Sequence, residues 1–157
     1  MTQSEKISKY EDIVPQIQAL VSGVKYGISS LANFVAAVHR NMNFFWTGFY
    51  VVEGDQLLLG PFQGDPACLS IHKSKGVCGT AYTKEQTIVV EDVDKFPGHI
   101  ACSSLSKSEI VVPVFSKSGK ITAVLDIDSD HLATFDDIDK KYLEKAVTYL
   151  QEYESFI

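Results

Sequence analysis

The chain has 157 residues, 45% of them hydrophobic and 11% aromatic, which is enough for one domain with a buried core. Its formal net charge of -6 makes nucleic acid and anionic membrane surfaces unfavourable partners. No apolar run approaches the length of a membrane span, and the segment from Met1 to Leu20 lacks the apolar core of a secretory signal. We therefore expect a cytoplasmic protein with no nucleic-acid or membrane partner.

The three cysteines are Cys68, Cys78 and Cys102. Their number is odd, they are far apart in the sequence, and cytoplasmic thiols stay reduced, so structural disulfides explain them poorly. Catalytic or redox-active thiols, or plainly buried ones, remain as interpretations.

Two helices are expected in the first third of the chain. Apolar residues recur every three or four positions between Ile7 and Val21, and Pro15 should kink or restart this first helix. Ser22-Gly23 should end it. A second amphipathic pattern from Ile28 to Val38 predicts a helix that ends near Asn41.

The middle of the chain is typical of strands. Residues 44–52 are rich in aromatic and β-branched side chains and predict a strand, and Gly54-Asp55 is a turn signal. A return strand is expected over 56–59, with Gly60-Pro61 breaking it. Three shorter elements should follow: a weak strand over 67–71, a helix over 76–83 with Cys78 in its first turn, and a strand over 87–90.

The last third predicts a hairpin and a helix. Strands over 109–115 and 121–128 flank a turn at 116–120. Thr134 and Asp137 resemble a capping box, and the apolar spacing beyond them predicts a helix that continues to the C-terminus. Hairpins favour antiparallel pairing, so we predict an α+β fold in which helices pack on one antiparallel sheet and residues 1–157 form a single domain.

A long segment without a regular pattern, residues 91–107, precedes the first strand of this hairpin. Long irregular loops in compact domains are usually functional or disordered. Phe96, Ile100, Cys102 and Leu105 argue against disorder in this one. It is either a functional loop or a packed surface loop with an incidental cysteine.

Trp46, Gly48 and Tyr50 should share one face of their strand because side chains alternate along a strand. A glycine between two aromatic residues leaves a gap walled by rings, and such a gap suits a methyl group, a sulfur or a cation. Ordinary core packing, with the glycine placed under a helix, is the alternative.

Asp126 and Asp128 should also share a strand face. If the hairpin turn centres near Lys117-Ser118, Glu109 lies opposite Asp126 or one residue away, and the three acids converge. Neighbouring carboxylates repel unless a positive group or a shared proton is near, and neither strand contains a lysine or arginine. Three interpretations of the acids remain open: they bind the ammonium group of a ligand, they bind a metal ion, or they form a solvated acidic face.

The position of Cys102 shortly before this strand could hold its thiol over the acids, where backbone amides, His99 or Lys107 could activate it. A zinc site built from the three cysteines with His72 or His99 is a weaker hypothesis because the sequence has no CxxC pair. We treat both histidines as surface residues.

The chain resembles the free methionine-(R)-sulfoxide reductases, which are built on a single GAF domain. The resemblance covers nearly the whole chain and is carried by FWTGFY (45–50), LGPFQG (59–64), ACLSI and KGVCGTA (within 67–81), FPGHIACSSLSKSEIVVP (96–113) and LDIDS (125–129). Three cysteines combined with SEIVVP and DIDS are specific to this family among GAF domains. One departure is Ser103, since such proteins usually have an aspartate after the cysteine of HIAC.

The resemblance implies a six-stranded antiparallel GAF sheet, a homodimer and a small closed pocket without a cofactor or metal. For the thiols it implies that Cys102 is the nucleophile, Cys68 the resolving thiol and Cys78 an auxiliary. The implied substrate-binding residues are Glu109, Asp126 and Asp128, with Trp46 and Tyr50 around the methylsulfinyl end.

The implied reaction follows from these residue types. A Cys102 thiolate attacks the sulfoxide sulfur, and Asp128 or Glu109 protonates the departing oxygen. Cys102 is left as a sulfenic acid, which Cys68 converts to a disulfide that a dithiol such as thioredoxin reduces. A non-catalytic ligand-sensing GAF module and a thiol redox switch are the alternatives.

Overall fold

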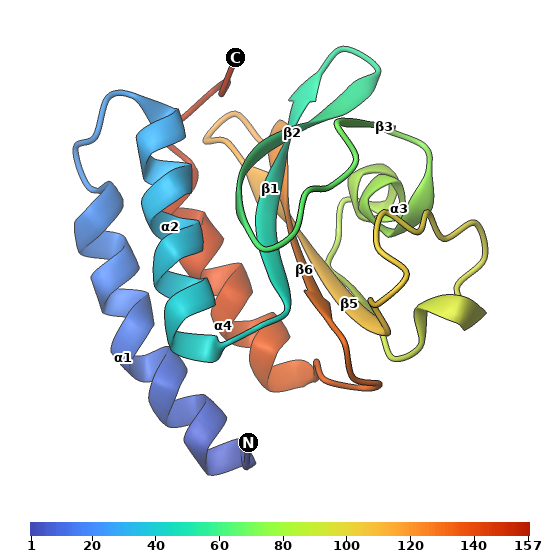
Figure 1. Ribbon diagram of the computed structural model, residues 1–157. Helices are drawn as coiled ribbons and strands as arrows, with labels where there is room; N and C mark the ends of the chain where they lie inside the picture. The colour runs from blue at the N-terminus through green and yellow to red at the C-terminus, as the bar shows by residue number, and fades with distance from the viewer.

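The computed structural model describes residues 1–157 and contains one six-stranded antiparallel sheet with four α-helices (Figure 1). The strands lie in the order β3-β2-β1-β6-β5-β4. Their bounds are β1 Trp46–Glu53, β2 Gln56–Gln63, β3 Ser70–His72, β4 Ile88–Val90, β5 Ser108–Phe115 and β6 Ile121–Ser129. The helices are α1 Gln3–Val21, α2 Gly27–Met42, α3 Gly76–Lys84 and α4 Asp137–Val147. The predicted α+β class and antiparallel sheet are confirmed.

The sheet has an apolar core on each face. Helices α1, α2 and α4 cover one face, and α3 lies on the other with the long loops (Figure 1). Alternation along the central strands separates the two cores: Leu125 and Ile127 of β6 belong to the core under the three helices, whereas Val124 belongs to the core on the α3 side. Asp126 therefore faces the α3 side, as does Glu109 of β5.

Pro15 was predicted to kink or restart the first helix, and the restart is wrong, because α1 is a single helix from Gln3 to Val21. Thr2 caps the helix in a capping box with Glu5, and packing of its apolar face outweighs the cost of the proline. Pro15 is exposed, and so is Glu11, the residue whose carbonyl loses its helical hydrogen-bond partner to the proline.

The predicted end of the second strand at Gly60-Pro61 is also wrong, since β2 continues to Gln63. The ladder with β1 shifts register between the pairs Tyr50–Leu59 and Gly48–Phe62, so the glycine and the proline lie in a bulge. A bulge tolerates a proline because the extra residue does not need a ladder hydrogen bond.

Helix α4 begins at a different cap from the predicted one. Asp136, not Thr134, is the N-cap, and it forms a capping box with Asp139. The Thr134 hydroxyl is engaged with Ser129 at 2.6 Å and cannot cap the helix. The α-helix also ends at Val147, followed by a 3-10 turn over Thr148–Leu150, instead of continuing to the C-terminus.

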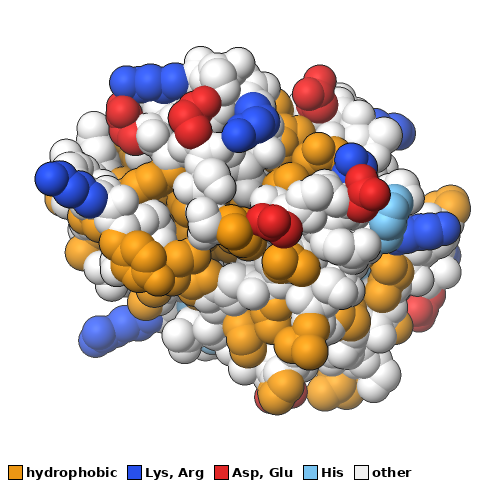
Figure 2. All heavy atoms as spheres, turned by 90° about the horizontal axis from the view of Figure 1, so that it is seen from above, with side chains coloured by type: hydrophobic (Ala, Val, Ile, Leu, Met, Phe, Trp, Pro, Cys, Tyr) orange, Lys and Arg blue, Asp and Glu red, His pale blue; other side chains and the backbone are white.

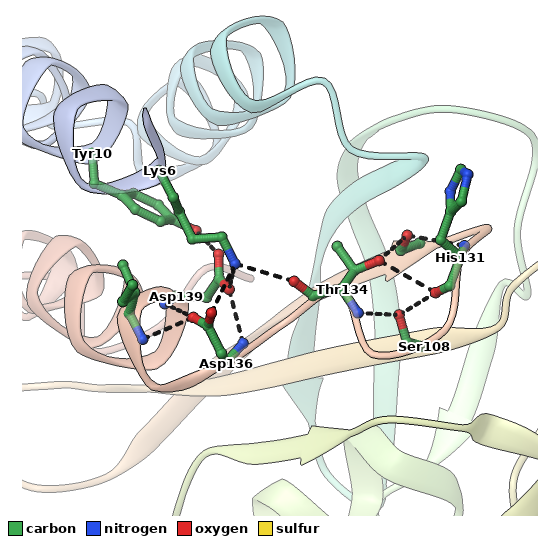
Figure 3. A network of polar contacts seen from close by, with 9 residues as sticks. Lys6, Tyr10, Ser108, His131, Thr134, Asp136 and Asp139 are labelled. Carbon is green, nitrogen blue, oxygen red and sulfur yellow. Dashed lines mark hydrogen bonds and ion pairs between the residues drawn. The ribbon is translucent and has the colours of Figure 1, made fainter. Parts of the chain in front are cut away.

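A buried polar network joins α1 to α4 and to the end of the sheet (Figure 3). The Lys6 ammonium donates to Asp139 at 2.6 Å and to the Thr134 carbonyl at 3.1 Å, and the Tyr10 hydroxyl donates to the same carboxylate at 2.6 Å. The Thr134 backbone amide donates to the Ser108 hydroxyl at 3.3 Å. Because Ser108 directly precedes Glu109, this network fixes the start of β5.

No helix is long and apolar enough to cross a membrane. Viewed from above, apolar side chains are interspersed with lysine, aspartate and glutamate (Figure 2).

Candidate active site

Three carboxyl groups converge on the α3 side of the sheet. Glu109 pairs with Asp128 across β5 and β6, and Val111 pairs with Asp126. The sequence predicts Glu109 opposite Asp126 or one residue away, and this prediction is wrong. The observed partner of Glu109 is Asp128, two residues beyond Asp126 in β6. A shift of two preserves the face of the sheet, so all three acids still line one cavity.

Strand β1 places two aromatic rings beside the acids, since Trp46 pairs with Asp128 and Gly48 pairs with Asp126. The open gap expected at Gly48 is wrong, because a Cβ built there would lie 2.5 Å from Cη2 of the Trp46 indole. The indole itself covers the glycine. It is stacked on Tyr50 with ring centroids 6.2 Å apart, and both rings line the cavity.

The two rings also hold the loop that follows β2. The Trp46 Nε1–H donates to the Asp65 carbonyl at 2.9 Å, and the Tyr50 hydroxyl donates to the Cys68 carbonyl at 2.9 Å. Replacing Tyr50 would therefore remove a contact to Cys68 as well as part of the cavity wall.

A disulfide joins Cys68 to Cys102, with the two Cα atoms 5.5 Å apart. It connects the loop before β3 to the long loop before β5, above the acids. Cys102 lines the cavity. The pair that the resemblance implied is thus bonded in the structure.

Cys78 is free and buried in the first turn of α3. Its sulfur and one oxygen each of Glu109 and Asp126 lie within 4.8 Å of one another. These are the side chains that could hold a metal ion, in place of the predicted combination of three cysteines and a histidine. Burial, followed by the charges of Asp126 and Glu109, raises the pKa of the Cys78 thiol well above its usual range, which disfavours the thiolate that a metal requires.

Burial and mutual repulsion govern the protonation of the acids. Burial, then the charges of Asp126 and Asp128, raises the pKa of Glu109 well above its usual range. Burial also raises the pKa of Asp126, and burial with the charge of Asp126 raises the pKa of Asp128. The Asp126 Oδ1 atom is buried without a hydrogen-bond partner. Such a cluster favours a shared proton or a bound cation.

This electrostatic arrangement predicts how the stability of the substrate-free protein depends on pH. Raised pKa values mean that the folded state binds more protons than the unfolded chain, whose carboxyl groups titrate near about pH 4. The free energy of unfolding should therefore fall as the pH rises from about 4 through the pKa values of the folded cluster.

Urea unfolding at several pH values checks this expectation. Glu109→Gln should flatten the decline, because it removes one buried titrating group. Asp130→Asn, at an exposed acid just beyond β6, should leave the decline unchanged. A free energy of unfolding that rises across this range would contradict the prediction.

His99, treated above as a surface residue, lies in the cavity, and that prediction is wrong. Its Nε2 atom is 3.8 Å from Glu109 Oε2, and its side chain is only 14% exposed. Burial lowers the pKa of His99 and favours the neutral imidazole. Its position three residues before Cys102 in a loop over the acids was the available signal. His72 is exposed, as expected.

Several other cavity residues were not predicted from the sequence. They include small or polar residues from both loops: Asp65, Pro66, Ala67, Ser103 and Ser106. Ser103, at which the sequence departs from the family pattern, thus faces the same space as the acids.

A six-stranded sheet with a cavity between its α3 face and two long loops is the architecture of a GAF domain, and a family model for that domain matches residues 28–151. GAF domain-containing protein A of Dictyostelium discoideum is 52% identical over 151 residues, covering 96% of this chain and 95% of the relative. Free methionine-R-sulfoxide reductase of Escherichia coli is 42% identical over 148 residues, covering 94% and 89%.

The crystal structure of free methionine-R-sulfoxide reductase from Neisseria meningitidis in complex with its substrate superposes with a TM-score of 0.91. It is 46% identical to this chain, and the match covers 96% of this chain and 91% of that one. The chain therefore belongs to the free methionine-(R)-sulfoxide reductase family of GAF domain proteins.

Proposed function

We propose that the protein reduces free L-methionine-(R)-sulfoxide to L-methionine. The observation that carries this proposal is the convergence of three carboxyl groups on the cavity that Cys102 lines: the buried Glu109 and Asp126 and the half-buried Asp128. The names of the related reductases support the choice of substrate.

The acids distinguish a free amino acid from a residue in a protein. A free amino acid carries an ammonium group, and the unpartnered Asp126 Oδ1 can accept a hydrogen bond from it. Peptide-bound methionine sulfoxide has no such group and would leave the carboxylates buried without a cation. Trp46 and Tyr50 supply apolar surface for the methylsulfinyl end.

The first half of the reaction uses Cys102 as the nucleophile. Its thiolate attacks the sulfoxide sulfur while a protonated Glu109 or Asp128 gives a proton to the oxygen. Burial raises the pKa of both acids and so favours the protonated form that this step needs. The oxygen then passes from the substrate sulfur to the Cys102 sulfur as the transient bond between the two sulfur atoms breaks. Methionine departs, and Cys102 becomes a sulfenic acid.

The second half regenerates the thiols. The Cys68 thiol attacks the sulfenic sulfur, water leaves, and the Cys68–Cys102 disulfide forms. Thioredoxin then reduces this disulfide by two exchange steps. We assign Cys78 an auxiliary role beside Asp126 and Glu109, and no step uses a cofactor or metal ion.

We also propose that the whole chain, residues 1–157, forms one GAF domain that works as a cytoplasmic homodimer. Leu20 at the end of α1, Tyr26 before α2 and the C-terminal Ile157 are all exposed, and Figure 1 places these segments at the same end of the molecule. Equilibrium sedimentation measures the mass directly, and a monomer at micromolar concentration would refute the dimer.

The deciding experiment is an assay of methionine release from free methionine-(R)-sulfoxide with dithiothreitol as the reductant. We expect repeated turnover, and a poor rate with the (S) epimer. A sensor module or a redox switch would bind or oxidise without releasing methionine, so an absence of methionine would refute the proposed function.

A further inference from the structure

An apolar rim surrounds the Cys68–Cys102 disulfide, and we define it as Leu69, Ile100 and Leu105. Leu69 follows Cys68 and is 80% exposed, while Ile100 and Leu105, on either side of Cys102, are 37% and 57% exposed. Consecutive Cα atoms are about 3.8 Å apart, so each rim residue lies within about 11 Å of its nearer cysteine. Exposed apolar side chains gathered at one place indicate an interaction surface.

The two sulfur atoms have different surroundings. Cys102 lines the cavity, whereas Cys68 is not among the cavity residues. The Tyr50 hydroxyl holds the Cys68 carbonyl from the cavity side. Cys68 is half-buried and lies outside the cavity lining, so we expect an external thiolate that approaches over the rim to reach it without entering the cavity.

We infer that the apolar rim is the docking surface for a protein dithiol, and that the first thiolate of this partner attacks the Cys68 sulfur. The disulfide determines the chemistry of the protein that docks on the rim, because the disulfide returns to two thiols only by accepting two electrons. A protein that supplies these electrons through a thiol must cover the sulfur atom that the thiol attacks. The inference rests on the proposed function, which requires this disulfide to be reduced in every cycle.

The exchange balances in two steps. The partner thiolate bonds to the Cys68 sulfur, the Cys68–Cys102 bond breaks, and Cys102 leaves as a thiolate that faces the acids. The second thiolate of the partner then attacks the partner's own sulfur in the mixed disulfide and releases the Cys68 thiolate. The partner ends as an intramolecular disulfide, and the enzyme is ready for the next substrate.

Steady-state kinetics of Leu69→Ser and Leu105→Ser test the docking surface. Neither residue lines the cavity, whereas Ile100 does and is left unchanged. With thioredoxin as the reductant, we expect each change to raise the KM for thioredoxin about tenfold, because exposed anchors carry much of the binding free energy. With dithiothreitol or glutathione, the rates should stay within about twofold of the unchanged protein.

Leu132→Ser is the matched control, since Leu132 is 58% exposed in the turn between β6 and α4. Its thioredoxin KM should not change. An unchanged thioredoxin KM in both rim variants would overturn the docking surface. An equal loss with dithiothreitol and thioredoxin would also overturn it, because the rim would then act on the cavity. A protein inactive with every reductant would instead refute the proposed function.

A trapping experiment tests the point of attack. Thioredoxin whose second active-site cysteine is replaced by serine should remain covalently attached to the oxidised enzyme. Peptide mass spectrometry should find its sulfur bonded to Cys68. A mixed disulfide at Cys102 would overturn this part of the inference.

Discussion

Cys102→Ser should abolish methionine formation, including the single turnover that needs no external reductant. A serine hydroxyl is ionised far less readily than a thiol and cannot form the sulfenic acid, so a loss of at least about 10³-fold is expected. Cys78 cannot replace it, because that thiol is buried and its pKa is raised well above the usual range. Rapid quenching of reduced enzyme mixed with substrate measures the methionine formed per site.

Cys68→Ser is the matched comparison, since it removes the other half of the same disulfide. This variant should release one methionine per site and then fail to cycle with thioredoxin. Cys78→Ser should still cycle with thioredoxin. Normal cycling by Cys68→Ser would make Cys78 the resolving thiol, and a full single turnover by Cys102→Ser would remove Cys102 from the chemistry.

The sheet face of the acids could be predicted from the sequence because side chains alternate along a strand whatever the register. That rule alone assigns Asp126 and Asp128 to one face of β6 and Leu125 and Ile127 to the opposite face. The pairing of Glu109 was missed by two residues, since the position of a hairpin turn sets register and several polar residues compete for the turn.

Residues in irregular segments could not be placed in the same way. A loop has no period, so no repeating pattern separates the half-buried His99 from the exposed His72. The same limit applies to Ser103 and Ser106, which line the cavity from the loop that contains Cys102. The restart predicted at Pro15 is wrong for a different reason, because tertiary packing of the helix outweighs the local propensity of the proline.

N-acetylation of the substrate should lower kcat/KM by more than about 100-fold. The acetyl group removes the ammonium charge and leaves the acids buried without a partner, which costs roughly 3–5 kcal/mol for a fully buried pair. Competition assays with free and N-acetylated methionine-(R)-sulfoxide measure the ratio directly. Equal rates would remove the acid cluster from substrate recognition.

Asp126→Asn tests the same interaction from the side of the protein. The amide keeps the shape but loses the charge, so KM should rise about 10- to 100-fold, the range for a lost charge-assisted hydrogen bond. The empty variant should be at least as stable as the unchanged protein, because one of three repelling groups is gone. Asp130→Asn, at an exposed acid, should match the unchanged protein in both respects.

Activity should survive a strong chelator, because the proposed reaction uses the acids to bind the ammonium group of the substrate and has no step that needs a metal ion. Activity that is lost on chelation and restored by zinc or manganese would instead place a metal among Cys78, Glu109 and Asp126.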